Sequence, residues 1–324
     1  MKTKTIYLQD IRQGDKIASS FLVTEKNMAF SQKGSPYINV RLKDKTGEVD
    51  AKVWDRVDEL DQTFKKGDII FIEGRVQSYR NALQVSILSA QTCDPQSIDP
   101  SDYLPASALD TDAMFAELTA FINTVKLEPA RKLLAAFFHD EKTAELFRRA
   151  PAAKGFHHGY LGGLLEHTLS VVKLLDRIAA HYPELDRDLL IAGGMLHDIG
   201  KIHELTYDNI IAYSDEGRLV GHLVIGVEML DGKIASIENF PERLALDLRH
   251  IILSHHGEFE YGSPKRPKTM EALVVHFMDD LDAKLNAFQS IVAADAANTD
   301  TEWTAYNRFF ERYLYKRKKG ETAG

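Results

Sequence analysis

A proline-containing stretch at residues 94–112 divides this chain into two parts with different sequence patterns. Pro95, Pro100 and Pro105 stand there among aspartate and serine, and prolines spaced through a polar stretch interrupt helix and sheet alike. A chain of 324 residues is long enough for two domains of about 100–200 residues each. We therefore expect one domain over 1–93, a linker over 94–112, a second domain over 113–315 and a basic tail over 316–324.

The first domain is predicted to be a small all-β barrel. Turn signals occur at Asp44–Gly47 and at Lys66–Asp68. Around them lie five runs of alternating or β-branched residues, at 17–24, 37–42, 48–54, 69–74 and 82–89. Five strands without a helical period favour a closed barrel. The run from Lys43 to Trp54 and the run from Lys66 to Val76 resemble an OB-fold of the anticodon-binding type.

An OB-fold implies binding of single-stranded nucleic acid through a charged groove with aromatic residues on which bases stack. The first 95 residues carry a net charge of +2 and the remainder −10, which is compatible with such a role. The alternative for the aromatic residues is that they belong to the barrel core. The candidate residues are Phe30, Lys33, Tyr37, Arg41, Trp54, Arg75, Tyr79 and Arg80. Lys52 is a further basic residue near them in the sequence.

The second domain is predicted to be helical and to contain the chemistry. Apolar residues recur there at helical spacing, which predicts helices over 111–125, 130–138, 164–182, 189–199 and 270–291, and another ending at 250–255. Gly193 and Gly194 would let a neighbouring helix approach closely. All 12 histidines of the chain lie between His139 and His276.

The adjacent pair His197-Asp198 is the most informative feature of this domain, because it offers an imidazole and a carboxylate from the end of one helix. Imidazoles mixed with carboxylates suit Mn, Fe, Co, Ni or Zn better than Ca or Mg alone. One histidine on an apolar helix face is usually a hydrogen-bonded core residue, but several at wide spacings favour a metal site. The other candidate ligands are His167, His222, His255, His256 and Asp279.

The order of these residues, with the run Leu196–Lys201 as its most specific part, resembles the HD superfamily of metal-dependent phosphohydrolases over about residues 155–300. The resemblance implies that His167, His197, Asp198 and Asp279 bind metal, with Asp279 chosen over Asp280 and Asp282. The expected fold class is thus multidomain, with an N-terminal all-β OB-fold barrel followed by an all-α HD-type helical bundle.

The segments Gly221-His222 and Ser254–Gly257 resemble the two-metal branch of that superfamily. This implies that His222 and His255 serve a second metal, that Asp198 bridges both ions, and that His256 either binds metal or touches substrate. Lys201 would contact phosphate oxygens, with a solvated surface lysine as the alternative. His276, one turn before Asp279, either faces the site or orients a ligand.

A pair of divalent ions with a shared carboxylate stabilises the attacking and leaving oxygens of a displacement at phosphorus. The combination of the barrel with the runs Phe156–Val171 and His276–Lys284 resembles the YhaM-like 3′→5′ exoribonuclease family. That resemblance implies hydrolysis of single-stranded RNA, and in some members of single-stranded DNA, to nucleoside 5′-monophosphates by a metal-bridging hydroxide. The implied cofactors are two divalent ions, with Mn first and Fe, Co, Ni or Mg as alternatives.

Two other functions remain open at the level of the sequence. One is an HD phosphohydrolase of free nucleotides or cyclic dinucleotides, and the other is a non-catalytic single-strand-binding protein. The single cysteine, Cys93, excludes an internal disulfide and thiolate-rich metal sites, and no leader or membrane-spanning run is evident, so a cytoplasmic protein is expected. The cluster of Arg308, Arg312 and residues 316–319, predicted on and after a final helix, is either a solvated tail or a phosphate contact.

Overall fold

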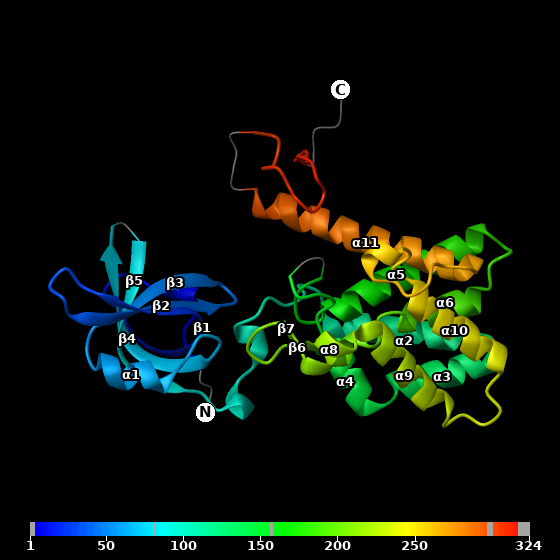
Figure 1. Ribbon diagram of the computed structural model, residues 1–324, viewed down its shortest axis with the longest axis horizontal. Helices are drawn as coiled ribbons and strands as arrows, with labels where there is room; N and C mark the ends of the chain where they lie inside the picture. Colours follow the sequence, from blue (N-terminus) through cyan, green and yellow to red (C-terminus); the bar gives the residue numbers. More distant parts are fainter. Residues whose placement is uncertain (1–3, 81, 156–157, 297–300, 317–324) are drawn as a thin grey trace. The chain divides into compact units, whose positions relative to one another are not determined.

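The computed structural model describes residues 4–80, 82–155, 158–296 and 301–316, which fall into two compact units (Figure 1). The first unit comprises residues 1–106 and 206–212, and the second comprises residues 107–205 and 213–324. The predicted linker contains two short 3-10 helices, Pro95–Ser97 and Pro100–Asp102. The domain borders given above stay a prediction.

The first unit is a closed five-stranded barrel with strand order β1-β2-β3-β5-β4. Its pairs are antiparallel except for the parallel pair of β3 and β5. Alternate residues of β2 are buried, as the period of a strand requires, and they fill the barrel interior. The predicted OB-type barrel is therefore confirmed. The strands are β1 (Lys16–Phe30), β2 (Pro36–Asp44), β3 (Gly47–Val53), β4 (Ile69–Tyr79) and β5 (Ala82–Thr92).

The helix α1 (Val57–Thr63) also belongs to this unit and was not predicted. Its Val57 and Leu60 are buried in the barrel core. A buried ion pair joins the chain start to the end of β2, since Lys4 Nζ lies 2.8 Å from Asp44 Oδ2. The same oxygen accepts a hydrogen bond from the backbone N–H of Leu8 at 2.9 Å. Because both charged side chains are almost fully enclosed, each depends on the other for compensation.

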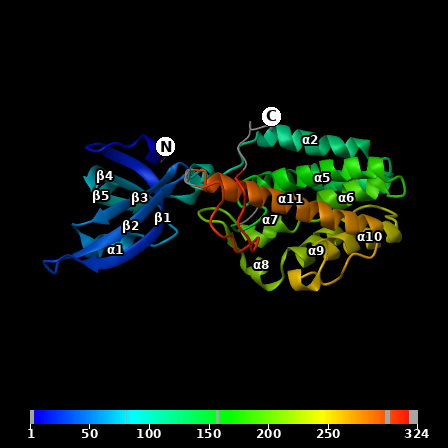
Figure 2. The same cartoon turned by 90° about the horizontal axis from the view of Figure 1, so that it is seen from above.

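The second unit is a helical bundle, as predicted. The short strands β6 (Leu205–Thr206) and β7 (Ala212–Tyr213) pair in a separate two-stranded sheet at the borders of the segment 206–212. The helices α4, α7, α8 and α9 were not predicted. Figure 2 shows α5, α6 and α11 running side by side. The helices are α2 (Thr111–Thr124), α3 (Glu128–Phe138), α4 (Glu141–Arg149), α5 (Gly163–His181), α6 (Arg187–Leu196), α7 (Lys201–Glu204), α8 (Asp215–Leu219), α9 (His222–Ile234), α10 (Glu242–Ser254) and α11 (Met270–Ala294).

The central helix of the bundle is α6, in which every residue from Leu189 to Leu196 is buried. Its paired glycines explain how neighbours approach so closely. A Cβ on Gly193 would lie 2.7 Å from the Ile251 side chain of α10, and one on Gly194 would lie 2.4 Å from the Leu175 side chain of α5. The predicted close approach is confirmed, and it fixes where the chain leaves α6.

The described residues after α11, 301–316, contain no helix, so the prediction of a final helix there is wrong. They form two antiparallel bridges instead, Trp303 with Tyr315 and Asn307 with Arg312. The basic residues 317–319 lie outside the described residues. Within the described part of the chain, no helix combines the length and the apolarity that crossing a membrane requires.

Candidate metal centre and nucleic-acid surface

Several elements of the second unit bring the seven predicted ligands to one place. His167 lies on α5, and His197 and Asp198 lie in the turn between α6 and α7. His222 begins α9, His255 and His256 follow α10, and Asp279 lies on α11. Gly200 permits this convergence, because a Cβ there would lie 2.1 Å from the carbonyl oxygen of His222. The turn bearing Asp198 can therefore reach the start of α9.

A first group of ligand atoms consists of His167, His197 and Asp279. The two Nε2 atoms of His167 and His197 are 3.3 Å apart, and Asp279 Oδ1 lies 3.1 Å from His167 Nε2 and 3.9 Å from His197 Nε2. All three side chains offer ligand atoms within 4.8 Å of one another. Neighbouring Asp280 is instead paired with Lys284 at 2.7 Å, which agrees with the choice of Asp279.

A second group consists of His222, His255 and His256, whose ligand atoms also lie within 4.8 Å of one another. The Nε2 atoms of His222 and His256 are 3.1 Å apart. His256 thus joins this group geometrically, which leaves both of its predicted roles open.

Asp198 lies between the two groups, with one carboxylate oxygen toward each. Its Oδ2 is 3.5 Å from His197 Nε2 and 3.7 Å from His167 Nε2. Its Oδ1 is 3.4 Å from His255 Nε2 and 3.6 Å from His222 Nε2. This Oδ1 is buried and has no hydrogen-bond partner among the described residues. A buried carboxylate oxygen without a partner is costly, and a cation would compensate it.

The outer nitrogens of the histidines show which ring atom faces the centre. A backbone carbonyl only accepts a hydrogen bond, so a ring nitrogen that contacts one carries the proton. In a neutral ring the other nitrogen, Nε2, is then an acceptor. Three rings are fixed in this way: His197 Nδ1 to Gly194 O at 2.8 Å, His255 Nδ1 to Ile252 O at 2.9 Å and His256 Nδ1 to Tyr261 O at 3.0 Å.

The other two rings are oriented by carboxylates that the sequence analysis missed. His167 Nδ1 contacts Asp282 Oδ2 at 2.7 Å, and His222 Nδ1 contacts Glu204 Oε1 at 2.8 Å. Carboxylates that receive the outer N–H of a histidine are the usual partners of metal-binding imidazoles. Two Nε2 lone pairs about 3 Å apart repel each other unless a cation or a proton lies between them. The donor set therefore fits divalent cations.

Asp282 also holds two further groups: it accepts from His158 Nε2 at 3.0 Å and from the hydroxyl of Ser170. The available signal for Asp282 was its place on the same stripe of the helix as Asp279. Glu204 offered no such signal, because no predicted metal ligand lies on α7 with it. His157, in the motif of the family resemblance, lies outside the described residues.

Burial and charge set the protonation of the centre. Burial lowers the pKa of His197 to about 4 and that of His256 to about 3, so both rings are neutral near pH 7. Burial would also lower the pKa of His167, but Asp279 and Asp282 outweigh it and raise this pKa to about 9. A metal ion at His167 must therefore displace a proton.

The carboxylate of Asp198 is ionised because nearby positive charge outweighs the effect of burial. Burial alone would raise the pKa of Asp198, but the charge of Lys201 and the nearby imidazoles hold it well below its usual range. Lys201 Nζ lies 2.6 Å from Asp198 Oδ2, and its side chain is 12% exposed, so the alternative of a solvated surface lysine is wrong.

A cavity of about 600 Å³ opens beside the two groups and is lined in part by Lys201, His255, His256 and Asp279. His276 lines it too, and its Nδ1 lies 2.7 Å from the carbonyl oxygen of His255. The cavity gives a substrate access to the ligand atoms and to the lysine at the same time.

In the barrel unit, the structure tests whether the candidate aromatic residues are core. Phe30 is 71% exposed, Trp54 46% and Tyr79 55%, so the core alternative is wrong for these three. Tyr37 and Trp54 are stacked with centroids 4.7 Å apart, and Lys52 Nζ lies 4.6 Å from the Tyr37 ring centroid. A stacked pair made of a half-buried tyrosine and an exposed tryptophan, with an ammonium group beside it, suits stacking of bases next to phosphates.

Strand register separates the eight candidates into groups. Phe30 pairs with Pro36, directly before Tyr37, and Lys33 lies in the same turn. Trp54 follows Val53, which pairs with Ile87 in the middle of β5, whereas Tyr79 pairs with Ala82 at the start of β5. Tyr79, with the exposed Arg75 and Arg80 of the same hairpin, therefore lies apart from the stacked pair.

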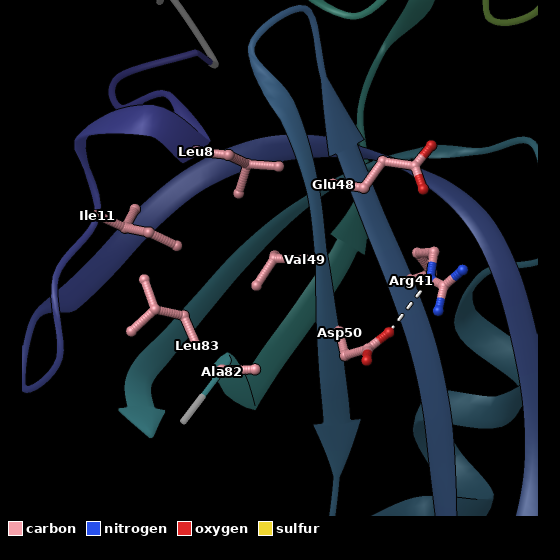
Figure 3. Close-up of a pocket in the computed structure, with 8 residues that line it drawn as sticks. All are labelled: Leu8, Ile11, Arg41, Glu48, Val49, Asp50, Ala82 and Leu83. Carbon is pink, nitrogen blue, oxygen red and sulfur yellow. Dashed lines mark hydrogen bonds and ion pairs between the residues drawn. The ribbon is translucent and has the colours of Figure 1, made fainter. Parts of the chain in front are cut away.

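Arg41 is engaged by acidic neighbours. Its guanidinium lies 3.2 Å from Asp50 and 3.6 Å from Glu25. Figure 3 shows Arg41 in a small pocket with Asp50 and Glu48, and with apolar residues such as Leu8 and Ile11 on the other side. These carboxylates reduce the attraction of this pocket for phosphate.

Fold and site together define the class of protein: a two-domain protein with an OB-fold domain and a metal-dependent phosphohydrolase domain of the HD type. The HD domain family matches residues 164–284, and the family described as OB-fold nucleic acid binding domain matches residues 22–92.

Two curated relatives extend the likeness to both domains. The 3′-5′ exoribonuclease YhaM of Bacillus subtilis is 34% identical over 284 residues, which cover 87% of this chain and 89% of that protein. The 3′-5′ exoribonuclease YhaM of Halalkalibacterium halodurans is 34% identical over 274 residues, covering 84% of this chain and 85% of that protein. The chain belongs to the YhaM family of 3′–5′ exoribonucleases.

Proposed function

We propose that this protein is a metal-dependent 3′→5′ exoribonuclease that hydrolyses single-stranded RNA to nucleoside 5′-monophosphates. The observation that carries the proposal is Asp198, which presents one oxygen to each of two convergent ligand groups. The full-length likeness to exoribonucleases supports the substrate class. Single-stranded DNA is a second substrate of the same chemical form.

Two divalent ions, with manganese as the first choice, fit the donor atoms. His167, His197 and Asp279 would hold one ion, His222, His255 and His256 the other, and Asp198 both. Bound ions of this kind supply a nucleophile at neutral pH and charge stabilisation at phosphorus. The mixture of imidazole and carboxylate donors in the two groups favours transition metals over Mg.

The remaining groups of the centre orient the histidine rings and compensate the charge of Asp198. Asp282 and Glu204 hold the rings of His167 and His222 with Nε2 toward the centre. The ammonium group of Lys201 compensates the charge of Asp198 and lines the cavity, where it would meet a phosphate oxygen. In the barrel, Tyr37 and Trp54 would hold upstream bases by stacking.

The test is incubation of the full chain with 5′-labelled single-stranded RNA and Mn²⁺. We expect progressive shortening from the 3′ end and no cleavage of a circular RNA. Internal cleavage, or no cleavage with any divalent ion, would contradict the proposal. Faster turnover of a cyclic dinucleotide or a free nucleotide than of RNA would favour the alternative phosphohydrolase.

Two variants separate an enzyme from a binding protein. Asp198→Asn should abolish shortening while single-strand binding by the barrel persists. Asp231→Asn is the matched control, because Asp231 is a surface aspartate of α9 paired with Arg249 at 2.7 Å, and it should cleave RNA as the unaltered chain does.

A further inference from the structure

The chain after α11 folds into a hairpin that neither the predicted metal centre nor the barrel accounts for. We call residues 303–315 the C-terminal hairpin. Thr304 N–H donates to Leu314 O at 2.9 Å, and Asn307 N–H donates to Arg312 O at 2.9 Å. Leu314 is 2% exposed and Thr304 5%. The hairpin therefore has defined internal pairing and a small buried base.

Two contacts fix this hairpin to α11, the helix that contributes Asp279. The rings of Phe310 and Phe288 meet edge to face with centroids 5.6 Å apart. Lys316 Nζ lies 2.7 Å from Asp295 Oδ2 at the end of α11. Figures 1 and 2 both show the hairpin, in red, beside α11. Its tip thus has a definite position relative to the ligand groups.

The composition of the hairpin is unusual for a surface segment. Six of its residues are aromatic, and three basic residues, Arg308, Arg312 and Lys316, lie in or next to it. Exposed aromatic residues beside basic ones are the pattern with which proteins hold single-stranded nucleic acid. Five of the aromatic side chains are at least 43% exposed: Trp303, Tyr306, Phe309, Tyr313 and Tyr315.

The tip of the hairpin is part of the wall of the catalytic cavity. Phe309, Phe310, Glu311 and Arg312 line the same cavity of about 600 Å³ as Asp279, Lys201, His255 and His256. Phe310 packs on Phe288 of α11, and Glu311 repels phosphate. The tip residues suited to a nucleotide are Arg312 and Phe309, which is 46% exposed and meets the Phe310 ring edge to face with centroids 4.9 Å apart. Arg312 Nε donates to Phe310 O at 2.7 Å, so its stem is positioned while other guanidinium N–H groups remain.

We propose that Phe309 and Arg312 hold the 3′-terminal nucleotides of the strand in the cavity, Phe309 by stacking on a base and Arg312 by contacting a phosphate. The proposal rests on the exoribonuclease function proposed above and names two residues that would touch its substrate. A stacked phenyl ring accepts every base, as an enzyme that removes nucleotides in succession requires. The guanidinium offsets the repulsion between the strand and the acidic groups Asp279 and Asp280.

The test compares enzyme variants on two substrates: an RNA oligomer, and the same oligomer with an abasic 3′-terminal residue. For the unaltered chain we expect kcat/KM to be about tenfold higher on the complete oligomer, the lower part of the range for one base stacked on an aromatic ring. Phe309→Ala should remove most of that preference, and Phe309→Trp should retain it. Tyr182→Ala, an exposed tyrosine at the end of α5, is the control.

The outcomes separate the two proposals. If the unaltered chain shortens RNA but Phe309→Ala keeps the full preference for the complete oligomer, the assignment of Phe309 is wrong. If the unaltered chain shortens neither oligomer, the exoribonuclease function fails and the hairpin proposal falls with it. Misfolding would lower kcat/KM for both oligomers by the same factor. A change in the ratio of the two kcat/KM values is therefore not explained by misfolding.

Arg312 is tested by salt dependence. The value of log kcat/KM falls as log salt rises. Removing one phosphate contact should make this slope less negative by about 0.7 for a single strand. We expect this change for Arg312→Met, along with a higher KM. An unchanged slope would refute the phosphate contact.

Discussion

Asp282→Asn tests whether a residue outside the two ligand groups still controls the centre. Asp282 accepts three hydrogen bonds, from His167 Nδ1 at 2.7 Å, from His158 Nε2 at 3.0 Å and from Ser170. Asparagine has the same shape, but it lacks the charge and replaces one acceptor oxygen with an NH₂ donor. The hydroxyl of Ser170 can turn to accept from that NH₂ group, but the rings of His167 and His158 lose the charged acceptor that orients them.

The magnitude follows from the bond that would be lost. A hydrogen bond to a charged group contributes about 1.5–3 kcal/mol. If that energy orients His167 toward the cation, its loss weakens metal binding by about 10- to 150-fold. This agrees with the 10- to 100-fold effects that are usual for the outer partners of metal ligands.

The assay is the rate of RNA shortening as a function of Mn²⁺ concentration. Asp282→Asn should shift the half-saturating concentration upward by about 10- to 100-fold and recover much of its rate at high Mn²⁺. Asp231→Asn should follow the unaltered curve. An Asp282→Asn variant with unchanged metal dependence would refute the positioning role, as would a folded variant whose rate no metal concentration restores.

Three further predictions follow from other contacts. Lys201→Met should lower kcat for RNA by about 100-fold, since it removes a cation that would meet the phosphate, and a rate within threefold of normal would contradict this role. Affinity for Mn²⁺ should rise by about tenfold per pH unit toward pH 9 and then level off, because the metal displaces the proton of His167. The pKa of His167 is about 9 without metal. Calorimetry that finds no proton release on Mn²⁺ binding at pH 7.5 would contradict this prediction. Asp44→Ala should destabilise the barrel by about 3–5 kcal/mol by leaving Lys4 buried and unpaired, and an unshifted denaturation midpoint would exclude it.

The barrel was predictable because apolar and polar residues alternate along a half-buried strand, and this alternation is visible in neighbouring residues of the sequence. The helix α9 was not, because apolar residues at nearly every position from Leu223 to Val227 hide its period. The region after α11 was wrongly assigned to a helix. Its aromatic residues pair across a hairpin, as Trp303 and Tyr315 do, and aromatic residues favour extended strands.

The ligand candidates were recognisable from the doublet His197-Asp198 and from the family resemblance. The carboxylates Asp282 and Glu204 were not, because their function depends on which ring nitrogen they reach after the helices have packed. The same holds for Phe309, which meets the cavity only because the hairpin folds back along α11. Local patterns predict elements, whereas contacts between distant elements have no local pattern.

The most direct test of the account is the anomalous diffraction of crystals loaded with Mn²⁺. We expect two peaks per chain, one within about 2.3 Å of Nε2 of His167 and His197 and the other within that distance of Nε2 of His222 and His255, with Asp198 between them. A single peak, peaks elsewhere, or an Asp198 carboxylate turned away from both ions would contradict the shared-carboxylate centre.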